Sequence, residues 1–153
     1  MDILDLQTRL RHAFRGSLQQ AIPKTRTYAD ASYRFYVDDI GITAHTAQLT
    51  LTQYVLPNEL WLRAGYRFHT QTAAYFWTDL WPQDGDPEAP RTADSDLSAF
   101  IAHEVSGAVR WFYDAGPVFN ALRASWLELT YAHYERDNGL HVDVVGLGWG
   151  HAI

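Results

Sequence analysis

The chain has 153 residues, 47% of them hydrophobic and 20% charged, which fits one folded domain and excludes a disordered chain. Its formal net charge of −6 argues against general nucleic-acid binding, because phosphates must be neutralised by a basic surface. It contains no cysteine, which excludes disulfides, thiolate metal sites and cysteine nucleophiles.

Residues 1–22 fit two secondary structures. As a strand, they place Leu10, Phe14 and Leu18 on one face and Arg11 and Arg15 on the other. As a helix, they also form an apolar stripe on one side. The regular parity of the arginines favours the strand, and the helix remains the alternative.

Three segments with a two-residue period follow, at residues 25–38, 43–55 and 60–71. In the third, Leu62 and Tyr66 alternate with Arg63 and Arg67, a pattern that a strand separates cleanly onto two faces. Short turn sequences at 23–24, 38–41 and 57–58 separate the segments. The pattern predicts consecutive antiparallel strands of about 12 residues, against a globular norm of about 5–6.

Residues 72–96 contain four Pro or Gly residues among acidic ones and predict a long loop. Alternation resumes at 97–114, 125–136 and 140–151, with a medium loop at 114–122. Asp137-Asn138-Gly139 is a strong hairpin turn signal. In the last strand, Val145, Leu147 and Trp149 are predicted to face outward. Asp143 has the same parity, so this strand alternates less regularly than the others. The whole chain therefore predicts about seven strands.

We expect an all-β fold, an antiparallel transmembrane β-barrel whose single domain or barrel segment covers residues 1–153. Strands of this length cross a bilayer, and the polar face is rich in arginine, serine, threonine and glutamine rather than lysine. Closure would need further strands or subunits, because seven is an unusual number for a single-chain bacterial barrel. The side chains predicted to line the lumen are Arg9, Arg11, Arg15, Arg26, Asp30, Arg34, Arg63, Arg67, His69, Glu104, Arg110 and Glu128.

Aromatic residues gather near the strand ends, where the rings of a barrel meet the water–lipid boundary. The predicted interface residues are Trp61, Trp77, Trp81, Trp111, Trp126 and Trp149. If the C-terminus is periplasmic, the 72–96 loop falls on the extracellular side, where barrels keep their long loops. The expected partner is the lipid bilayer of the bacterial outer membrane. A soluble β-barrel that binds an apolar ligand is the alternative, because a two-residue period does not reveal which face is wet.

Two stretches resemble a known family. Residues 33–46 (YRFYVDDIGITAHT) and 65–76 (GYRFHTQTAAYF) are similar to strings of a bacterial outer-membrane β-barrel family of unknown function. The resemblance implies that this chain corresponds to the C-terminal part of longer members. It also implies that strands from another segment or subunit complete the barrel. The chain ends in Ala152-Ile153, whereas the family has an aromatic at the end of its last strand.

No constellation indicates chemistry. The seven histidines show no recognised metal-ligand spacing, and a structural or interfacial role is favoured for them. No nucleophile elbow is present. The glycines of residues 146–150 indicate close strand packing rather than a phosphate loop, since no helix follows. We therefore predict no catalytic residue, metal or cofactor and a pore or scaffold. A membrane-embedded lipid-modifying enzyme is the third possibility.

Overall fold

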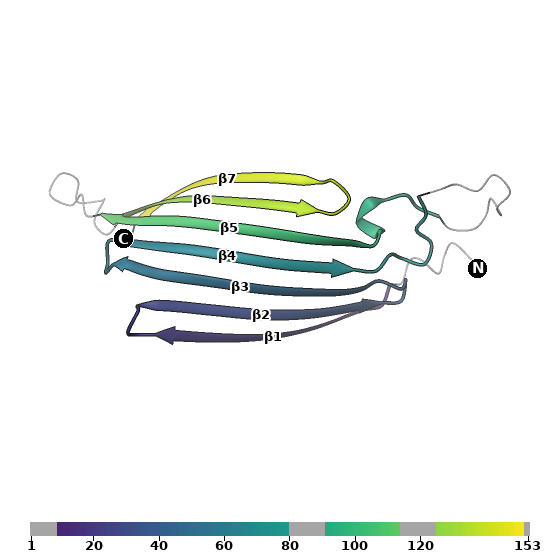
Figure 1. Cartoon of the computed structure of the whole chain (residues 1–153), viewed down its shortest axis with the longest axis horizontal. Coiled ribbons are helices and arrows are strands. Elements are labelled where there is room, and N and C mark those ends of the chain that lie inside the picture. Colours follow the sequence, from purple (N-terminus) through teal and green to yellow (C-terminus); the bar gives the residue numbers. More distant parts are fainter. Residues whose placement is uncertain (1–8, 80–90, 114–124, 152–153) are drawn as a thin grey trace.

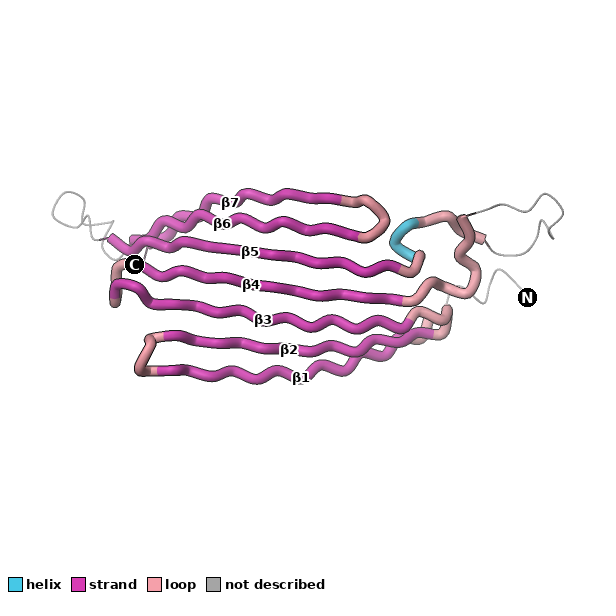
Figure 2. Tube along the Cα trace, in the orientation of Figure 1, coloured by secondary structure: helices cyan, strands magenta, loops and turns pink. Residues whose placement is uncertain are grey.

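The computed structural model describes residues 9–79, 91–113 and 125–151 and shows one antiparallel sheet (Figures 1 and 2). Seven strands pair in sequence order, each with its neighbours in the chain. Their bounds are β1 (Arg11–Ile22), β2 (Thr27–Asp38), β3 (Thr43–Leu56), β4 (Leu60–Gln71), β5 (Phe100–Tyr113), β6 (Ser125–Arg136) and β7 (His141–His151). The 3-10 turn η2 (Ser95–Leu97) precedes β5.

The all-β class and the seven long strands predicted from alternation are confirmed. Residues 11–22 form a strand, so the helical alternative is wrong for them; residues 1–8 lie outside the described part. The fifth strand begins at Phe100 rather than at Leu97, because the Asp94 side chain accepts a hydrogen bond from the Asp96 backbone and starts η2 there. The loop predicted at 114–122, and residues 80–90 of the loop predicted at 72–96, lie outside the described residues.

The strand register divides the sheet into two faces, since directly opposite residues in an antiparallel pair point to the same side. Gln48, Arg67 and Glu104 are opposite one another on β3, β4 and β5. Continued across the sheet, this face holds the odd positions of β1 and β4 and the even positions of the other strands. We call it the polar face, and the opposite one the apolar face.

The apolar face is exposed over the whole sheet. Phe14 on β1 is 66% exposed, Val105 on β5 56% and Leu147 on β7 81%. The strands form a single layer, and no second sheet or helix of the described residues lies on it (Figure 1). Large apolar side chains in a water-soluble sheet are normally buried by a second layer. The described residues leave this face without one.

A small buried cluster lies at one end of the sheet instead of on a face. Ile40, Ile42 and Ala74 form it, where the connection after β4 folds against the β2–β3 turn. Partly buried side chains packed on it are Tyr36, Phe76, Trp77 and Leu97. We call this the loop end of the sheet; residues 137–140 lie there too, whereas the tight connections 23–26 and 57–59 lie at the opposite, turn end (Figure 1).

The sheet is open. Within the described residues, β1 pairs only with β2 and β7 only with β6, so each has one edge with unpaired backbone groups. No helix among these residues is long and apolar enough to cross a membrane.

The glycines of β7 explain how its end packs. Gly148 and Gly150 lie on the polar face beside Trp126 of β6. A Cβ atom at Gly150 would lie 2.6 Å from the indole, closer than any real contact, so only glycine lets the ring pack on the β7 backbone. The close strand packing predicted for residues 146–150 is confirmed.

Candidate functional site

The polar face carries most of the side chains that were predicted to line a lumen. The register places on it Arg11, Arg15, Asp30, Arg34, Arg63, Arg67, His69, Glu104, Arg110 and Glu128. Arg9 precedes β1 but reaches the same face through Asp38. Arg26 does not belong to this group. It lies in the β1–β2 turn with a φ of 53°, because the reversal extends to residues 23–26 and β2 starts one residue later.

At the loop end, Arg9 pairs with the Asp38 carboxylate, whose side chain is fully buried. The Tyr36 hydroxyl donates a hydrogen bond of 2.8 Å to the same carboxylate, and the Ile42 backbone N–H donates one of 3.0 Å. Burial opposes the charge on Arg9, but the hydrogen bond and the negative charge of Asp38 hold the guanidinium pKa above its ordinary value. This network ties the start of β1 to the β2–β3 turn.

Near the turn end, the Arg110 guanidinium lies between two indoles. It is 4.7 Å from the ring centre of Trp61 and 4.2 Å from that of Trp126. It also pairs with Glu128 at 2.8 Å, and Trp61 is only 4% exposed. The Arg63 guanidinium also stacks on Trp61, 4.7 Å from the ring centre. Arginine suits such a site because its planar group stacks and pairs at once.

Trp61 and Trp126 were predicted as membrane-interface residues, yet they lie on the polar face, packed on guanidinium groups. Trp61 has the parity of Arg63 and Trp126 has that of Glu128, so parity indicates the polar face where nearness to a strand end does not. Trp77 packs on the buried cluster at the loop end, and Trp81 lies outside the described residues. Only Trp111 and Trp149 of the six lie on the apolar face of a described strand.

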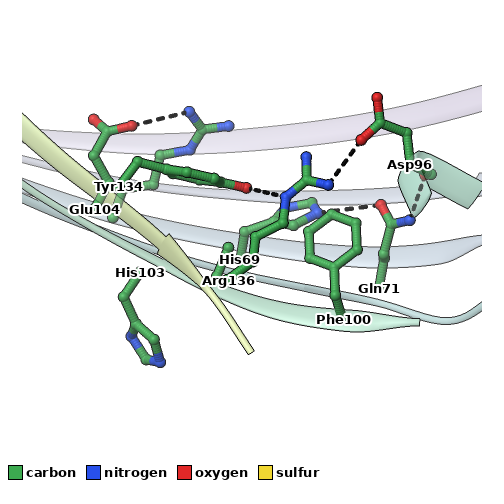
Figure 3. A pocket seen from close by; sticks show the side chains of 10 residues that line it. His69, Gln71, Asp96, Phe100, His103, Glu104, Tyr134 and Arg136 are labelled. Atoms are coloured by element: carbon green, nitrogen blue, oxygen red, sulfur yellow. Dashed lines mark hydrogen bonds and ion pairs between the residues drawn. The ribbon is translucent and has the colours of Figure 1, made fainter. Parts of the chain in front are cut away.

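A hollow of about 290 Å³ opens on the polar face near the loop end (Figure 3). Its wall includes Arg136, which pairs with Asp96 at 2.7 Å, donates to the Tyr134 hydroxyl at 2.6 Å and stacks on Phe100 at 4.1 Å. Arg136 was not among the predicted lumen residues, although its even position on β6 matches that of Glu128. His69 also borders the hollow, half-buried, and its Nδ1 lies 2.9 Å from the Thr46 hydroxyl.

Charge is distributed unevenly over the polar face. On β4–β6, Arg67 lies 3.8 Å from Glu104 and Arg110 is paired with Glu128. On β1–β4, no carboxylate among the described residues pairs with Arg11, Arg15, Arg34 or Arg63. Arg15 and Arg34 are directly opposite each other, and Asp30 instead accepts a hydrogen bond from Gln19 at 2.7 Å. This half of the face therefore presents uncompensated positive charge.

The apolar face has a polar band at each end. Toward the loop end, tyrosine hydroxyls bond to charged or titratable groups: Tyr33 to His45 at 2.6 Å, Tyr66 to His103 at 2.7 Å, and Tyr131 to Asp143 at 2.7 Å. Toward the turn end, the Trp149 indole N–H donates to the Tyr113 hydroxyl at 2.9 Å, and the Trp111 and Tyr113 rings are 5.3 Å apart. The side chains between the two bands include Leu49, Leu51, Val109, Leu129 and Val145.

A family model described as "Protein of unknown function (DUF3570)" matches residues 7–143, which is most of the chain. The chain belongs to the DUF3570 family. The predicted membership of an uncharacterised family is confirmed for this DUF3570 chain, while the family description itself states no activity or location. No curated protein and no solved structure matches the DUF3570 chain.

Proposed function

We propose that this chain forms part of the wall of an outer-membrane β-barrel, with its apolar face toward lipid and its polar face toward the lumen. The observation that carries the proposal is the continuous exposure of large apolar side chains on one face of all seven strands. Burying such side chains contributes about 25 cal/mol per Å² of apolar area, so a face of this size requires an apolar neighbour.

The two polar bands support lipid as that neighbour. On β5, the segment from His103 to Trp111 is about 27 Å long at roughly 3.4 Å per residue. A strand tilt of about 40° reduces this to roughly 20 Å along the membrane normal, close to the apolar band of about 25 Å on known barrels. Tyrosine and tryptophan with hydrogen-bonded polar groups are typical of the water–lipid boundary.

The polar face supports a lumen, because its charges would be costly in hydrocarbon and are suited to water or to one another. The unpaired edges of β1 and β7 support the same assignment: in lipid every backbone group must be paired, so a wall segment must be continued at both edges. Further strands or copies of the chain would supply that continuation.

Single-cysteine labelling tests which face meets lipid, and the absence of native cysteine makes each label unique. Adjacent positions form matched pairs: Val105→Cys with Ser106→Cys, and Leu49→Cys with Gln48→Cys. After reconstitution in vesicles, fluorophores at 105 and 49 should be quenched severalfold more by nitroxide-labelled lipid than those at 106 and 48, and aqueous iodide should give the reverse order. Equal quenching within each pair, or a chain that is monodisperse without detergent, would contradict the proposal in favour of a soluble barrel.

We also propose that the lumen attracts anions, because Arg11, Arg15, Arg34 and Arg63 lack a carboxylate partner among the described residues. In planar bilayers with a KCl gradient, the reversal potential should indicate a preference for chloride, and replacing Arg15 and Arg34 by Gln should reduce it. Arg26→Gln is the control, since Arg26 lies in a turn. A cation preference would contradict the anion proposal, and an absence of conductance would leave the wall as a scaffold.

A further inference from the structure

The β6–β7 hairpin brings four metal-ligating side chains together. The residues before and after the 137–140 turn pair in register, with His133 opposite Asp143 and Glu135 opposite His141. All four occupy odd positions of β6 and β7 and therefore share the apolar face, at its loop end. Neighbouring positions on one face of an antiparallel pair have Cβ atoms about 5 Å apart, close enough for side chains to share one ion.

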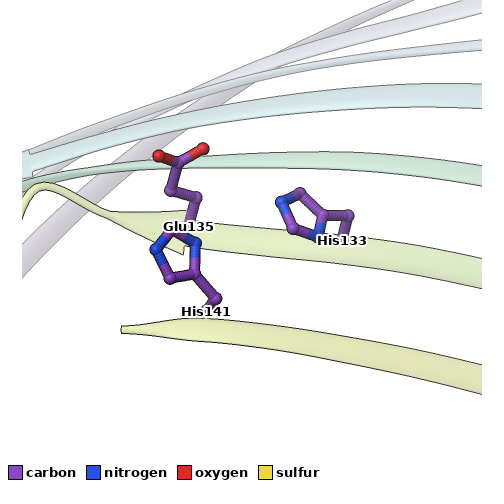
Figure 4. Close-up of side chains that lie close together, drawn as sticks. All are labelled: His133, Glu135 and His141. Atoms are coloured by element: carbon purple, nitrogen blue, oxygen red, sulfur yellow. The ribbon is translucent and has the colours of Figure 1, made fainter. Parts of the chain in front are cut away.

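Three of these side chains converge. His133, Glu135 and His141 each offer one ligand atom, and these atoms lie within 4.8 Å of one another. Figure 4 shows His133 and Glu135 on β6 and His141 on β7. A tetrahedral Zn²⁺ ion with bonds of about 2.0–2.1 Å separates its ligand atoms by about 3.3 Å. Glu135 and His141 are exposed, so rotamer changes can close the remaining distance without displacing a packed core.

The fourth side chain orients one of the ligands. His133 Nδ1 lies 2.9 Å from Asp143 Oδ1, and the same oxygen accepts a hydrogen bond of 2.7 Å from the Tyr131 hydroxyl. A histidine that binds metal through one ring nitrogen commonly donates the N–H of the other to a carboxylate, which fixes the ring and raises its basicity. With the proton on Nδ1 facing Asp143, the Nε2 lone pair of His133 is available to a metal ion.

The other histidines of the apolar face lack this surrounding. His45 bonds to Tyr33, and His103, although opposite Glu135, has its Nδ1 bonded to Tyr66. Among the residues described, His133, Glu135 and His141 are the group that meets the geometric conditions for a shared ion.

We propose that His133, Glu135 and His141 bind one divalent transition-metal ion of the zinc type, with Asp143 as the positioning residue for His133. Two imidazoles and one carboxylate suit borderline cations such as Zn²⁺ and are a poor set for Mg²⁺, which requires oxygen ligands. Three protein ligands leave a fourth position for water or for a donor from a partner. The ion would link β6 to β7 at the end of their hairpin. All three ligands come from this hairpin, so the site does not depend on closure of a barrel.

Isothermal titration of the untagged, EDTA-treated chain in detergent micelles tests the site. The chain should bind one Zn²⁺ per molecule and show no Mg²⁺ binding under the same conditions. Glu135→Gln and His141→Ala should each weaken Zn²⁺ binding at least tenfold, and Asp143→Asn should weaken it about 10–100-fold, as loss of an outer-shell carboxylate does. His151→Ala is the matched control, because His151 is exposed on the same face at the far end of β7.

Circular dichroism of each variant checks that the sheet is retained, since Glu135 and His141 are exposed and their replacement should leave it folded. Zn²⁺ should also raise the midpoint of thermal unfolding of the parent chain and not that of the His141→Ala variant. Lack of Zn²⁺ binding by the folded parent, equal binding by the His141→Ala variant, or an equal loss in the His151→Ala variant would each overturn the proposal. None of these outcomes tests the proposal that the chain forms a barrel wall, which the labelling experiment tests separately.

Discussion

Replacing Leu49 by Arg should lower the free energy of unfolding of the vesicle-inserted protein by about 2–4 kcal/mol, the range for a charged side chain on the lipid face near the bilayer midplane. Leu49 lies at the middle of β3 on the apolar face, and its neighbours across the strands are Ala31 and Tyr66. An Arg side chain at this depth cannot reach water without bending the bilayer or the chain.

The matched control is Thr50→Arg, the next residue of the same strand. Thr50 lies on the polar face, opposite Asp30, so the new guanidinium would meet a carboxylate rather than acyl chains. Its cost should stay below about 1 kcal/mol, as for an ordinary surface substitution. Urea titration of both variants in thin-bilayer vesicles gives the comparison. Similar losses for the two variants would contradict the assignment of the apolar face to lipid.

Removing Arg110 should destabilise the sheet strongly. Its guanidinium is paired with Glu128, whose side chain is only 16% exposed, and lies between Trp61 and Trp126. Arg110→Ala deletes two ring contacts and leaves a largely buried carboxylate without its partner, at a cost on the order of 3 kcal/mol. Arg110→Lys keeps the charge but loses the planar stacking, so it should cost about half as much.

Arg15→Ala serves as the comparison for Arg110→Ala, because Arg15 faces Arg34 and has no ion pair within the described residues. Removing one of two like charges that lie directly opposite each other should be neutral or slightly stabilising. Equilibrium unfolding in detergent, followed by tryptophan fluorescence, measures both. A loss for Arg15→Ala that equals the loss for Arg110→Ala would show that the stacked ion pair has no special weight.

Much of this architecture is predictable from the sequence, because a two-residue period specifies both the strand and its faces. Arg63, Arg67 and His69 share the parity that places them together on β4. Proximity to a strand end does not determine a face, and Trp61 and Trp126, two of the predicted interface residues, lie on the polar face. The sequence alone identifies the face of Trp61, because Trp61 has the parity of Arg63. The structure adds that the Arg63 guanidinium stacks on the Trp61 ring.

Ligand spacings along a single segment do not reveal the histidine and carboxylate cluster, because its members come from both strands of a hairpin. The useful signal is symmetric about the turn: His-x-Glu before Asp137-Asn138-Gly139 and His-x-Asp after it. Once the hairpin fixes the register, His133 must face Asp143 and Glu135 must face His141. The prediction that Arg26 lies in a strand was wrong for a related reason, because the exact length of a turn decides whether a flanking residue belongs to a strand.

The strictly sequential pairing of the strands has a kinetic consequence. The β1–β2, β2–β3, β3–β4 and β6–β7 pairings each close a connection of at most four residues, and the β5–β6 pairing closes residues 114–124, so β1–β4 and β5–β7 can each form by successive hairpins. The β4–β5 pairing must close the connection from residue 72 to residue 99, which costs about 2 kcal/mol more than closing the β1–β2 turn. We therefore expect the pairing of β4 with β5, next to the loop-end cluster of Ile40, Ile42 and Ala74, to be the slow step that joins the two groups of strands into one sheet.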